Sequence, residues 1–208
     1  MWKRFVFRVL VLVCFGEIVF SASEGIEAKE LVVNATFESA DREQLPRGWS
    51  VWSPVWDKAA CRLKSVDEGL LVEAADPYAV GGVFQEIKDI EPRQAYAVKA
   101  VCRLRNIPTP YQSVLLRIIW TRRGKLLHPA GMLVRGRVLA GGIASFEDVL
   151  VAPETADGAR LSLEVKWPQG GSVIWREVSV QPTLAPGHGR LKWVLYICDR
   201  ETVHLRII

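Results

Sequence analysis

The sequence predicts an all-β protein, a jelly-roll β-sandwich with an N-terminal signal segment and a short C-terminal extension. Two observations predict this fold. About ten short segments combine apolar and polar residues in strand-like patterns, and turn residues such as Gly, Pro and Asp separate them. No segment has the apolar spacing of an amphipathic helix. A globular part of roughly 150 residues also buries about 70% of its unfolded surface, so such a fold needs no covalent staples.

The clearest strands are expected at residues 94–105 and 113–122. In the first, one face carries the apolar residues Tyr96, Val98, Ala100, Cys102 and Leu104, and the other carries Ala97, Lys99, Val101, Arg103 and Arg105. The second strand divides less cleanly, with Arg117 on its polar face. Two prolines in the connection have no N–H to donate to a sheet. We therefore expect a sheet with one buried face and one polar, basic face that suits a polar ligand.

The remaining strands are predicted from short apolar runs bounded by turn signals. Before residue 94, strands are expected at 31–38, 49–52, around 56–63, at 70–73 and at 80–87, and Gly81-Gly82 indicates a bulge in the last of these. After residue 122, a hairpin turn at 122–125 leads to strands at 141–151, 161–167 and 172–180. Two packed layers of such strands make a sandwich or jelly roll.

Residues 1–23 are expected to be a signal peptide. Lys3 and Arg4 supply positive charge, residues 9–16 form an apolar run too short to span a bilayer, and Ser21-Ala22-Ser23 has the small residues that a signal peptidase reads. We therefore expect a secreted or periplasmic protein with no membrane attachment after cleavage. Because Glu17 interrupts this region, an uncleaved anchor is the alternative.

The sandwich domain is expected to span residues 24–182. A linker rich in Pro and Gly follows at 183–190, and residues 191–208 are strand-like on both sides of Asp199-Arg200. A segment of fewer than about forty residues does not support a core of its own. The last segment is therefore either the start of a truncated second domain or a hairpin that packs back on the sandwich.

Composition and motifs argue against several classes of function. The net charge of +4 is modest and its arginines are spread over the predicted strands, so we expect no nucleic-acid partner. Without the leader, Cys61, Cys102 and Cys198 remain, and an odd number excludes a fully paired disulfide framework. Cys102 is expected to be a buried thiol, with a bridge to Cys61 as the alternative. No catalytic motif is present and the histidines are isolated, so we do not expect an enzyme.

Several motifs, taken in order, resemble a known family. Residues 34–38 (Asn-Ala-Thr-Phe-Glu) precede a Gly48-Trp49 pair, and residues 173–180 alternate around Trp175 and Glu177. Together they resemble CenC-type carbohydrate-binding modules with the galactose-binding-like jelly roll, over residues 31 to 182. The resemblance implies a noncatalytic secreted module that binds a polysaccharide or oligosaccharide. It also implies an accessory role to a hydrolase, whose domain would follow at the C-terminus.

The resemblance further implies a structural calcium ion. Many family members hold it between the end of the first strand and the last strand, and Glu38 and Glu177 match those positions. Calcium takes six or more oxygen ligands, so two carboxylates from opposite ends of the domain would join the termini. Because Arg176 stands where the family often has an acidic residue, two exposed or ion-paired glutamates are the alternative.

Eight tryptophans indicate aromatic platforms for sugar rings, whose C–H faces stack on aromatic planes. The candidate ligand residues are Trp52, Trp56 and Tyr78 near loops, with Lys99, Arg103 and Arg117 on the polar face. The cations either bind sugar hydroxyls and carboxylates or form cross-strand ion pairs. By alternation, Trp120 and Trp167 fall on the apolar side and are expected to pack in the core.

Two other functions fit the same fold, because a fold does not determine a function. One is a structural or protein-interaction β-sandwich without a sugar site. The other is the N-terminal fragment of a secreted glycoside or carbon–nitrogen hydrolase. The exposure of the tryptophans distinguishes the first of these from a sugar-binding module.

Overall fold

The computed structural model describes residues 29–39, 41, 44–54, 61–74, 76–128 and 131–185, together with the backbone of two strands nearer the C-terminus. The predicted signal peptide, the linker after residue 185 and Trp56 lie outside the described residues. No helix in the described part of the chain is both long enough and apolar enough to cross a membrane.

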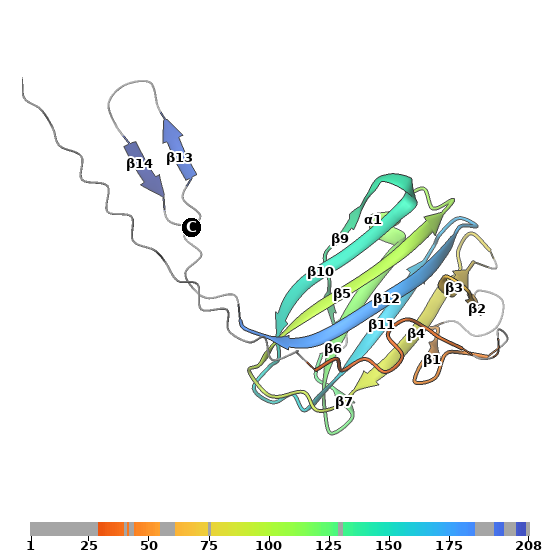
Figure 1. Cartoon of the computed structure of the whole chain (residues 1–208), viewed down its shortest axis with the longest axis horizontal. Coiled ribbons are helices and arrows are strands. Elements are labelled where there is room, and N and C mark those ends of the chain that lie inside the picture. Colours follow the sequence, from red (N-terminus) through yellow and green to blue (C-terminus); the bar gives the residue numbers. More distant parts are fainter. Residues whose placement is uncertain are drawn as a thin grey trace, which may run out of the picture.

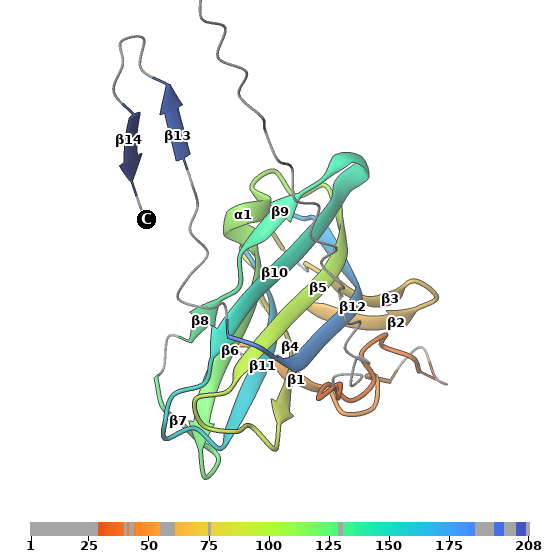
Figure 2. The ribbon, with the colours of Figure 1, turned by 60° about the vertical axis from the view of Figure 1, so that its left-hand side comes forward.

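Two antiparallel sheets lie face to face, with β10, β5 and β12 over β6 and β11 (Figures 1 and 2). Sheet A contains, in spatial order, β1 (Ser50–Trp52), β4 (Val80–Ile87), β11 (Gly158–Lys166), β6 (Val114–Arg122) and β7 (Lys125–Leu126), and β8 (Met132–Leu133) also pairs with β6. Sheet B contains β2 (Arg62–Val66), β3 (Gly69–Glu73), β12 (Ser172–Thr183), β5 (Ala95–Arg105), β10 (Ile143–Val151) and β9 (Gly136–Val138). The predicted all-β sandwich is confirmed.

Three short elements complete the described chain. Helix α1 (Pro110–Ser113) lies between β5 and β6, and the 3-10 turn η1 (Ala140–Gly142) precedes β10. The backbone of β13 (Val194–Ile197) pairs with that of β14 (Val203–Arg206) as an antiparallel hairpin. This hairpin lies where the sequence predicts strand-like residues. Strand β12 continues to Thr183, the first residue of the expected linker.

The core fills the space between the sheets with alternate residues of the long strands. It includes the fully buried Leu161, Leu163 and Val165 of β11. Tyr96 of β5 and Trp120 of β6 join the two layers, with 6.1 Å between their ring centroids. Phe146 of β10 and Trp175 of β12 lie in the same sheet on either side of β5, with 5.6 Å between their ring centroids. Each fully buried large side chain contributes about 1.5–3 kcal/mol to stability.

Alternation predicts the buried faces of β5 and β6 correctly, but the two strands do not share one sheet. β5 is central in sheet B and β6 lies in sheet A, so the connection through α1 crosses from one layer to the other. Their polar faces therefore point to opposite outer sides of the sandwich. The pattern of one strand specifies which side chains are buried, whereas the choice of partner strand depends on long-range packing.

The strand predicted at residues 31–38 is wrong. The segment forms turns, with Asn34 and Phe37 in left-handed backbone conformations (φ 54° and 61°). The Asn34 side chain accepts a hydrogen bond from the Glu38 N–H at 2.8 Å and donates to the Glu38 carbonyl at 2.7 Å. Asn tolerates this conformation and often closes such turns.

The predicted position of the β-bulge is also wrong. The register of β4 against β11 is unbroken through Gly81-Gly82, so the predicted bulge is absent there. A bulge occurs instead in β12 between Trp175 and Glu177. It leaves Arg176 and Glu177 both exposed, which the simple two-residue period would not allow.

Most residues that alternation predicts to be buried are buried, although Leu104 is only partly buried. Trp120 and Cys102 are buried, and both Cys102 and Cys61 are free thiols. Burial raises the pKa of the Cys102 thiol to about 12. Trp167, however, is 54% exposed, because its left-handed φ of 51° ends the alternation directly after Lys166.

Candidate functional site

The described candidate ligand residues lie in three places. Lys99 and Arg103 are on the outer face of sheet B, and Trp52 and Arg117 belong to strands of sheet A. Tyr78 lies in the loop before β4 and is 76% exposed. The structure therefore separates the two cations of β5 from the other candidates.

On sheet B the cations form solvent-exposed ion pairs. The Lys99 ammonium lies 3.1 Å from the Glu147 carboxylate on β10, and both side chains are more than half exposed. The Arg103 guanidinium lies 2.8 Å from the Glu68 carboxylate. Such pairs contribute little to stability, at most about 1 kcal/mol. These contacts correspond to the cross-strand ion pairs that the sequence leaves as an alternative to ligand binding.

The outer face of sheet A is different, because it holds buried polar groups. The odd-numbered residues of β11 from Ala159 to Val165 face the core, so Ser162 and Glu164 face away from it. Both are nevertheless buried. A charged side chain with so little access to water needs a partner.

That partner is Arg117 on the neighbouring strand β6. Its Nη2 donates a hydrogen bond to Glu164 Oε2 at 3.0 Å, and the exposed fractions of the two side chains are 23% and 5%. Burial raises the pKa of Glu164, while the positive charges of Arg117 and Lys166 act in the opposite direction. The face thus presents a fixed, nearly dehydrated pair of opposite charges.

Aromatic side chains lie in the same rows of the sheet. Ser162 is the cross-strand neighbour of both Arg117 and Phe84, and the Arg160 guanidinium lies 4.5 Å from the centre of the Phe84 ring. In the adjacent row, Gly82 separates Trp52 on β1 from Glu164 on β11. Phe84 and Trp52 are half-buried. The outer face of sheet A therefore combines ring surfaces with charge-assisted hydrogen-bonding groups.

Two further rings lie beyond the end of this face. The Trp167 N–H donates to the Ala79 carbonyl at 2.9 Å, and the Gln169 N–H donates to the Pro77 carbonyl at 3.2 Å. These bonds extend the pairing of β4 with β11 past Lys166. Tyr78 and the exposed Trp167 are thus carried on adjacent segments.

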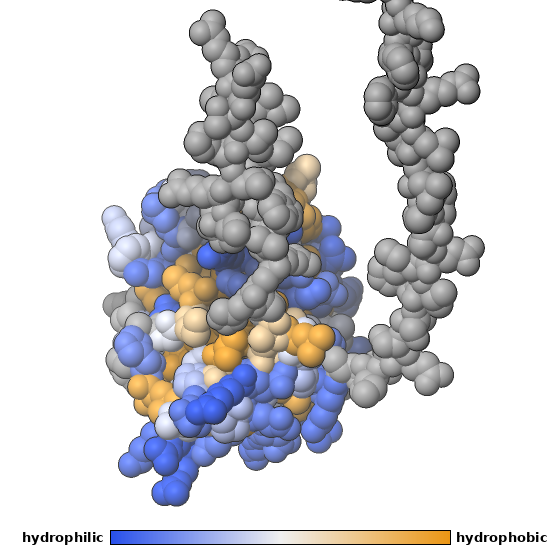
Figure 3. Space-filling view, turned by 90° about the vertical axis from the view of Figure 1, so that its left-hand side faces the viewer, coloured by the Kyte–Doolittle hydropathy of each residue, from blue (hydrophilic) through white to orange (hydrophobic). Residues whose placement is uncertain are grey.

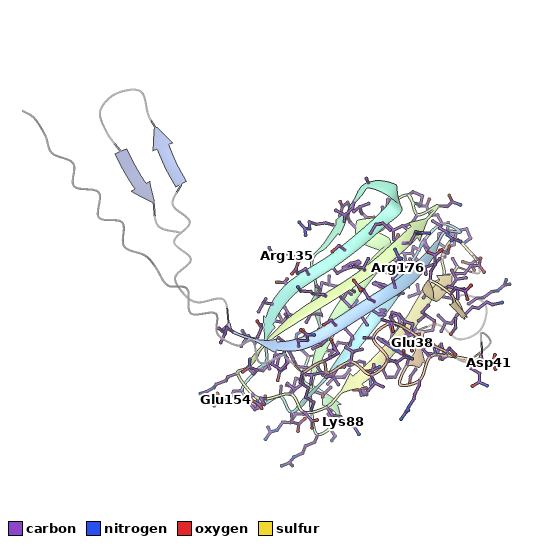
Figure 4. All side chains as sticks on the ribbon, viewed as in Figure 1. Glu38, Asp41, Lys88, Arg135, Glu154 and Arg176 are labelled. Carbon is purple, nitrogen blue, oxygen red and sulfur yellow. The ribbon has the colours of Figure 1, made fainter. Side chains whose placement is uncertain are left out.

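The proposed calcium ligands do approach each other. Glu38 and Glu177 line one surface pocket on sheet B, together with Asp67, Glu68 and Arg176. Figure 4 labels Glu38 and Arg176 among the side chains of the sandwich. Among the residues that the structure describes, no three His, Cys, Asp or Glu side chains form a group that could hold a metal ion. Calcium held by Glu38 and Glu177 would therefore need backbone oxygens as further ligands.

An apolar pocket opens at another edge of the sandwich, between β6 and β8 on one side and β9 and β10 on the other. It has a volume of about 90 Å³ and is lined by Val114, Leu133, Phe146 and other apolar residues. Tyr111, Met132 and Leu133 nearby are exposed. Figure 3 shows hydrophobic side chains gathered on this side of the molecule.

Sequence reasoning missed two parts of the sheet A site. Phe84 lies in the strand expected at residues 80–87, and nothing in the sequence distinguishes it from the other residues of that strand. Trp167 was assigned to the core, although the following Pro168 and the turn at Gly170 signal that the strand ends at Lys166. The Glu164 side chain is on the predicted polar face, but its burial has no signal in the sequence.

Comparison with known proteins supports the fold class. No family model matches the chain, and no curated protein matches it. An apo-form cyclase from Fischerella sp. has 9% identity and a TM-score of 0.53, over 77% of this chain and 98% of the cyclase. The enzymatically active domain of bacteriophage CBA120 tailspike protein 4 has 14% identity and a TM-score of 0.52, over 66% of this chain. The match spans 20% of the tailspike chain.

Carbohydrate-binding modules are also among the solved structures retrieved. The CBM22-1 xylan-binding domain of Paenibacillus barcinonensis Xyn10C has 12% identity and a TM-score of 0.45, over 76% of this chain and 97% of that domain. At identities of 9% and 14%, the matches to the cyclase and the tailspike domain concern the fold alone. With the two antiparallel sheets, they support the jelly-roll β-sandwich that the strand pattern predicts.

Proposed function

We propose that this protein is a noncatalytic glycan-binding module and that its binding face is the outer face of sheet A. The observation that carries this proposal is the Arg117–Glu164 pair, held with little exposure beside Phe84 and Trp52. Sugar recognition needs ring surfaces for C–H faces and a few placed polar groups for hydroxyls. This face supplies both.

The charged pair is suited to hydroxyl groups. The Arg117 guanidinium is 23% exposed and has five N–H donors, so it can donate to a sugar hydroxyl, while the Glu164 carboxylate, 5% exposed, holds it in place. Because the two charges already neutralise each other, a neutral sugar can approach without leaving a new unpaired charge. Because both strands hold the pair in place, little side-chain entropy is lost on binding.

We also propose that the module is exported and serves a hydrolase. The support is the leader-like composition of residues 1–23 and the family resemblance of residues 31 to 182. N-terminal sequencing of protein expressed with its leader tests export: a mature chain that begins at Glu24 is expected. An unprocessed chain in the membrane fraction would indicate the anchor instead.

The binding test uses calorimetry with cello-, xylo- and β-1,4-galacto-oligosaccharides. We expect at least one series to bind wild type, and Arg117→Ala to weaken this binding at least tenfold through loss of a charge-assisted hydrogen bond. Trp52→Ala, at the edge of the same face, should also weaken it. The matched control is Lys99→Ala on the outer face of sheet B, which should bind like wild type.

Two results would overturn this proposal. One is a wild-type protein that binds no member of a broad glycan panel at millimolar concentration. The other is binding that Lys99→Ala reduces while folded Arg117→Ala and Trp52→Ala proteins retain it, because that would place the ligand on the other sheet.

A specific observation favours a protein-interaction role as the second candidate. Exposed Met132 and Leu133 form β8 at the apolar pocket, and the exposed Tyr111 also lines that pocket. Contiguous exposed apolar residues are typical of contact surfaces. If this role is the function, Leu133→Asp should abolish a concentration-dependent increase in mass seen by analytical ultracentrifugation.

A further inference from the structure

Trp167 combines two features that rarely occur together. Its side chain is 54% exposed, and its backbone is in the left-handed region at φ 51°. A bulky residue is uncommon in that region, because its Cβ crowds the backbone there. Such outliers persist where the surroundings hold them, and they concentrate at ligand sites.

The surroundings hold Trp167 from both sides. Its N–H donates to the Ala79 carbonyl at 2.9 Å, and its carbonyl accepts a hydrogen bond from the buried Ser113 hydroxyl at 3.3 Å. The Lys166 ammonium lies 4.0 Å from the centre of the indole ring. The backbone is therefore pinned while one of the largest apolar side chains is presented to solvent.

The Trp167 ring lies beyond one end of the outer face of sheet A. Trp167 directly follows β11, the strand that carries Ser162 and Glu164. At about 3.3 Å per residue, Trp167 lies roughly 17 Å from Ser162 along the strand direction. Tyr78 lies two residues before β4, in the segment that pairs with residues 167–169.

We propose that Trp167 and Tyr78 form a second aromatic subsite, and that the ligand is an extended glycan chain lying along β4 and β11, from Phe84 to Trp167. This inference rests on the proposed function and specifies its ligand as a polymer segment of several sugars, not a single terminal sugar. Lys166, next to the indole, supplies a donor for hydroxyls of the stacked sugar.

The test measures affinity against chain length, from disaccharide to hexasaccharide, for the glycan series that wild type binds. Wild-type affinity should increase over the longer oligosaccharides. Trp167→Ala and Tyr78→Ala should lose about tenfold on the hexasaccharide and little on the disaccharide. Tyr111→Ala removes an exposed ring at another edge and serves as the matched control, with wild-type affinity at every length.

The failures of this inference and of the proposed function are distinguishable. If Arg117→Ala weakens disaccharide binding but Trp167→Ala and Tyr78→Ala match wild type at every length, the second subsite is wrong and the proposed function stands. If wild type binds no oligosaccharide of the panel, both are wrong.

Discussion

Arg117 on β6 and Glu164 on β11 form a charged pair on the outward side of a sheet, at 3.0 Å and with only 5% of the Glu164 side chain exposed. Burial of charge lowers stability unless a partner compensates for it. Keeping two charges with so little exposure on the outside of a sandwich therefore lowers the free energy of unfolding unless the two groups compensate each other. The location of this pair beside Phe84 and Trp52 is what connects it to ligand binding.

The first prediction concerns stability after loss of the cation. Arg117→Ala leaves the Glu164 carboxyl buried without its hydrogen-bond donor, and we expect the free energy of unfolding to fall by about 2 kcal/mol. Glu164→Gln in the Arg117→Ala background should recover part of that loss, because it removes the uncompensated charge. Urea unfolding measures both. Equal stability of wild type and Arg117→Ala would show that water already solvates this carboxylate.

The second prediction concerns pH. The pKa of Glu164 is raised above its usual 4.5, so the folded state binds more protons than the unfolded state at pH values between the two pKa values. This carboxyl therefore reduces stability as pH rises above about 4.5. In Arg117→Ala the pKa should rise further, and the loss of stability with rising pH should be steeper and extend to higher pH. Unfolding curves from pH 4 to 8 test this, and Arg117→Ala with the same pH profile as wild type would contradict it.

The third prediction separates stability from binding at Trp167. Glycine adopts a positive φ without strain, so Trp167→Gly should keep the wild-type unfolding free energy or raise it by up to about 1 kcal/mol. The same variant should lose the gain in affinity for long oligosaccharides. Thermal unfolding and calorimetry provide the two measurements.

Trp120→Ala provides the contrast for that experiment. Its ring is buried against Tyr96, so the substitution should cost about 3–5 kcal/mol. A Trp167→Gly protein destabilised as much as Trp120→Ala would mean that the exposed indole is structural.

The fourth prediction concerns calcium. If Glu38 and Glu177 hold the ion together with backbone oxygens, calcium at a hundred times its dissociation constant should stabilise the fold by about 2.7 kcal/mol. Glu177→Gln should abolish this calcium-dependent shift in Tm. Glu154→Gln, an exposed carboxylate paired with Arg93, should leave it intact. A wild-type Tm that is equal in calcium and in chelator would show that Glu38 and Glu177 do not bind calcium.

The sequence predicts the fold well where the pattern depends on local alternation. The long strands β5, β11 and β12 show it, and buried residues such as Cys102 follow from it. It does not place β5 and β6 in different sheets, because the partner of a strand depends on contacts between distant segments. Lys99 and Arg103 are separated from Arg117 because β5 and β6 belong to different sheets.

Several side chains near the site differ from the two-residue alternation, because local backbone features interrupt it. A left-handed Trp167 and the bulge before Glu177 each shift side chains to the opposite face. Asn34 ends the predicted first strand by bonding to the Glu38 backbone. Glu164 faces outward but is buried by neighbouring groups. The alternation of apolar and polar residues predicts which face a side chain is on, but it does not predict how exposed that side chain is.

The central claim is that glycan binds the outer face of sheet A, and an NMR titration tests it most directly. Wild-type protein labelled with ¹⁵N is titrated with the tightest-binding hexasaccharide, and backbone amide shifts are mapped by residue. The account predicts the largest changes at Phe84, Arg117 and Glu164, continuing to Trp167. Changes confined to Lys99 and Arg103 on sheet B would contradict it.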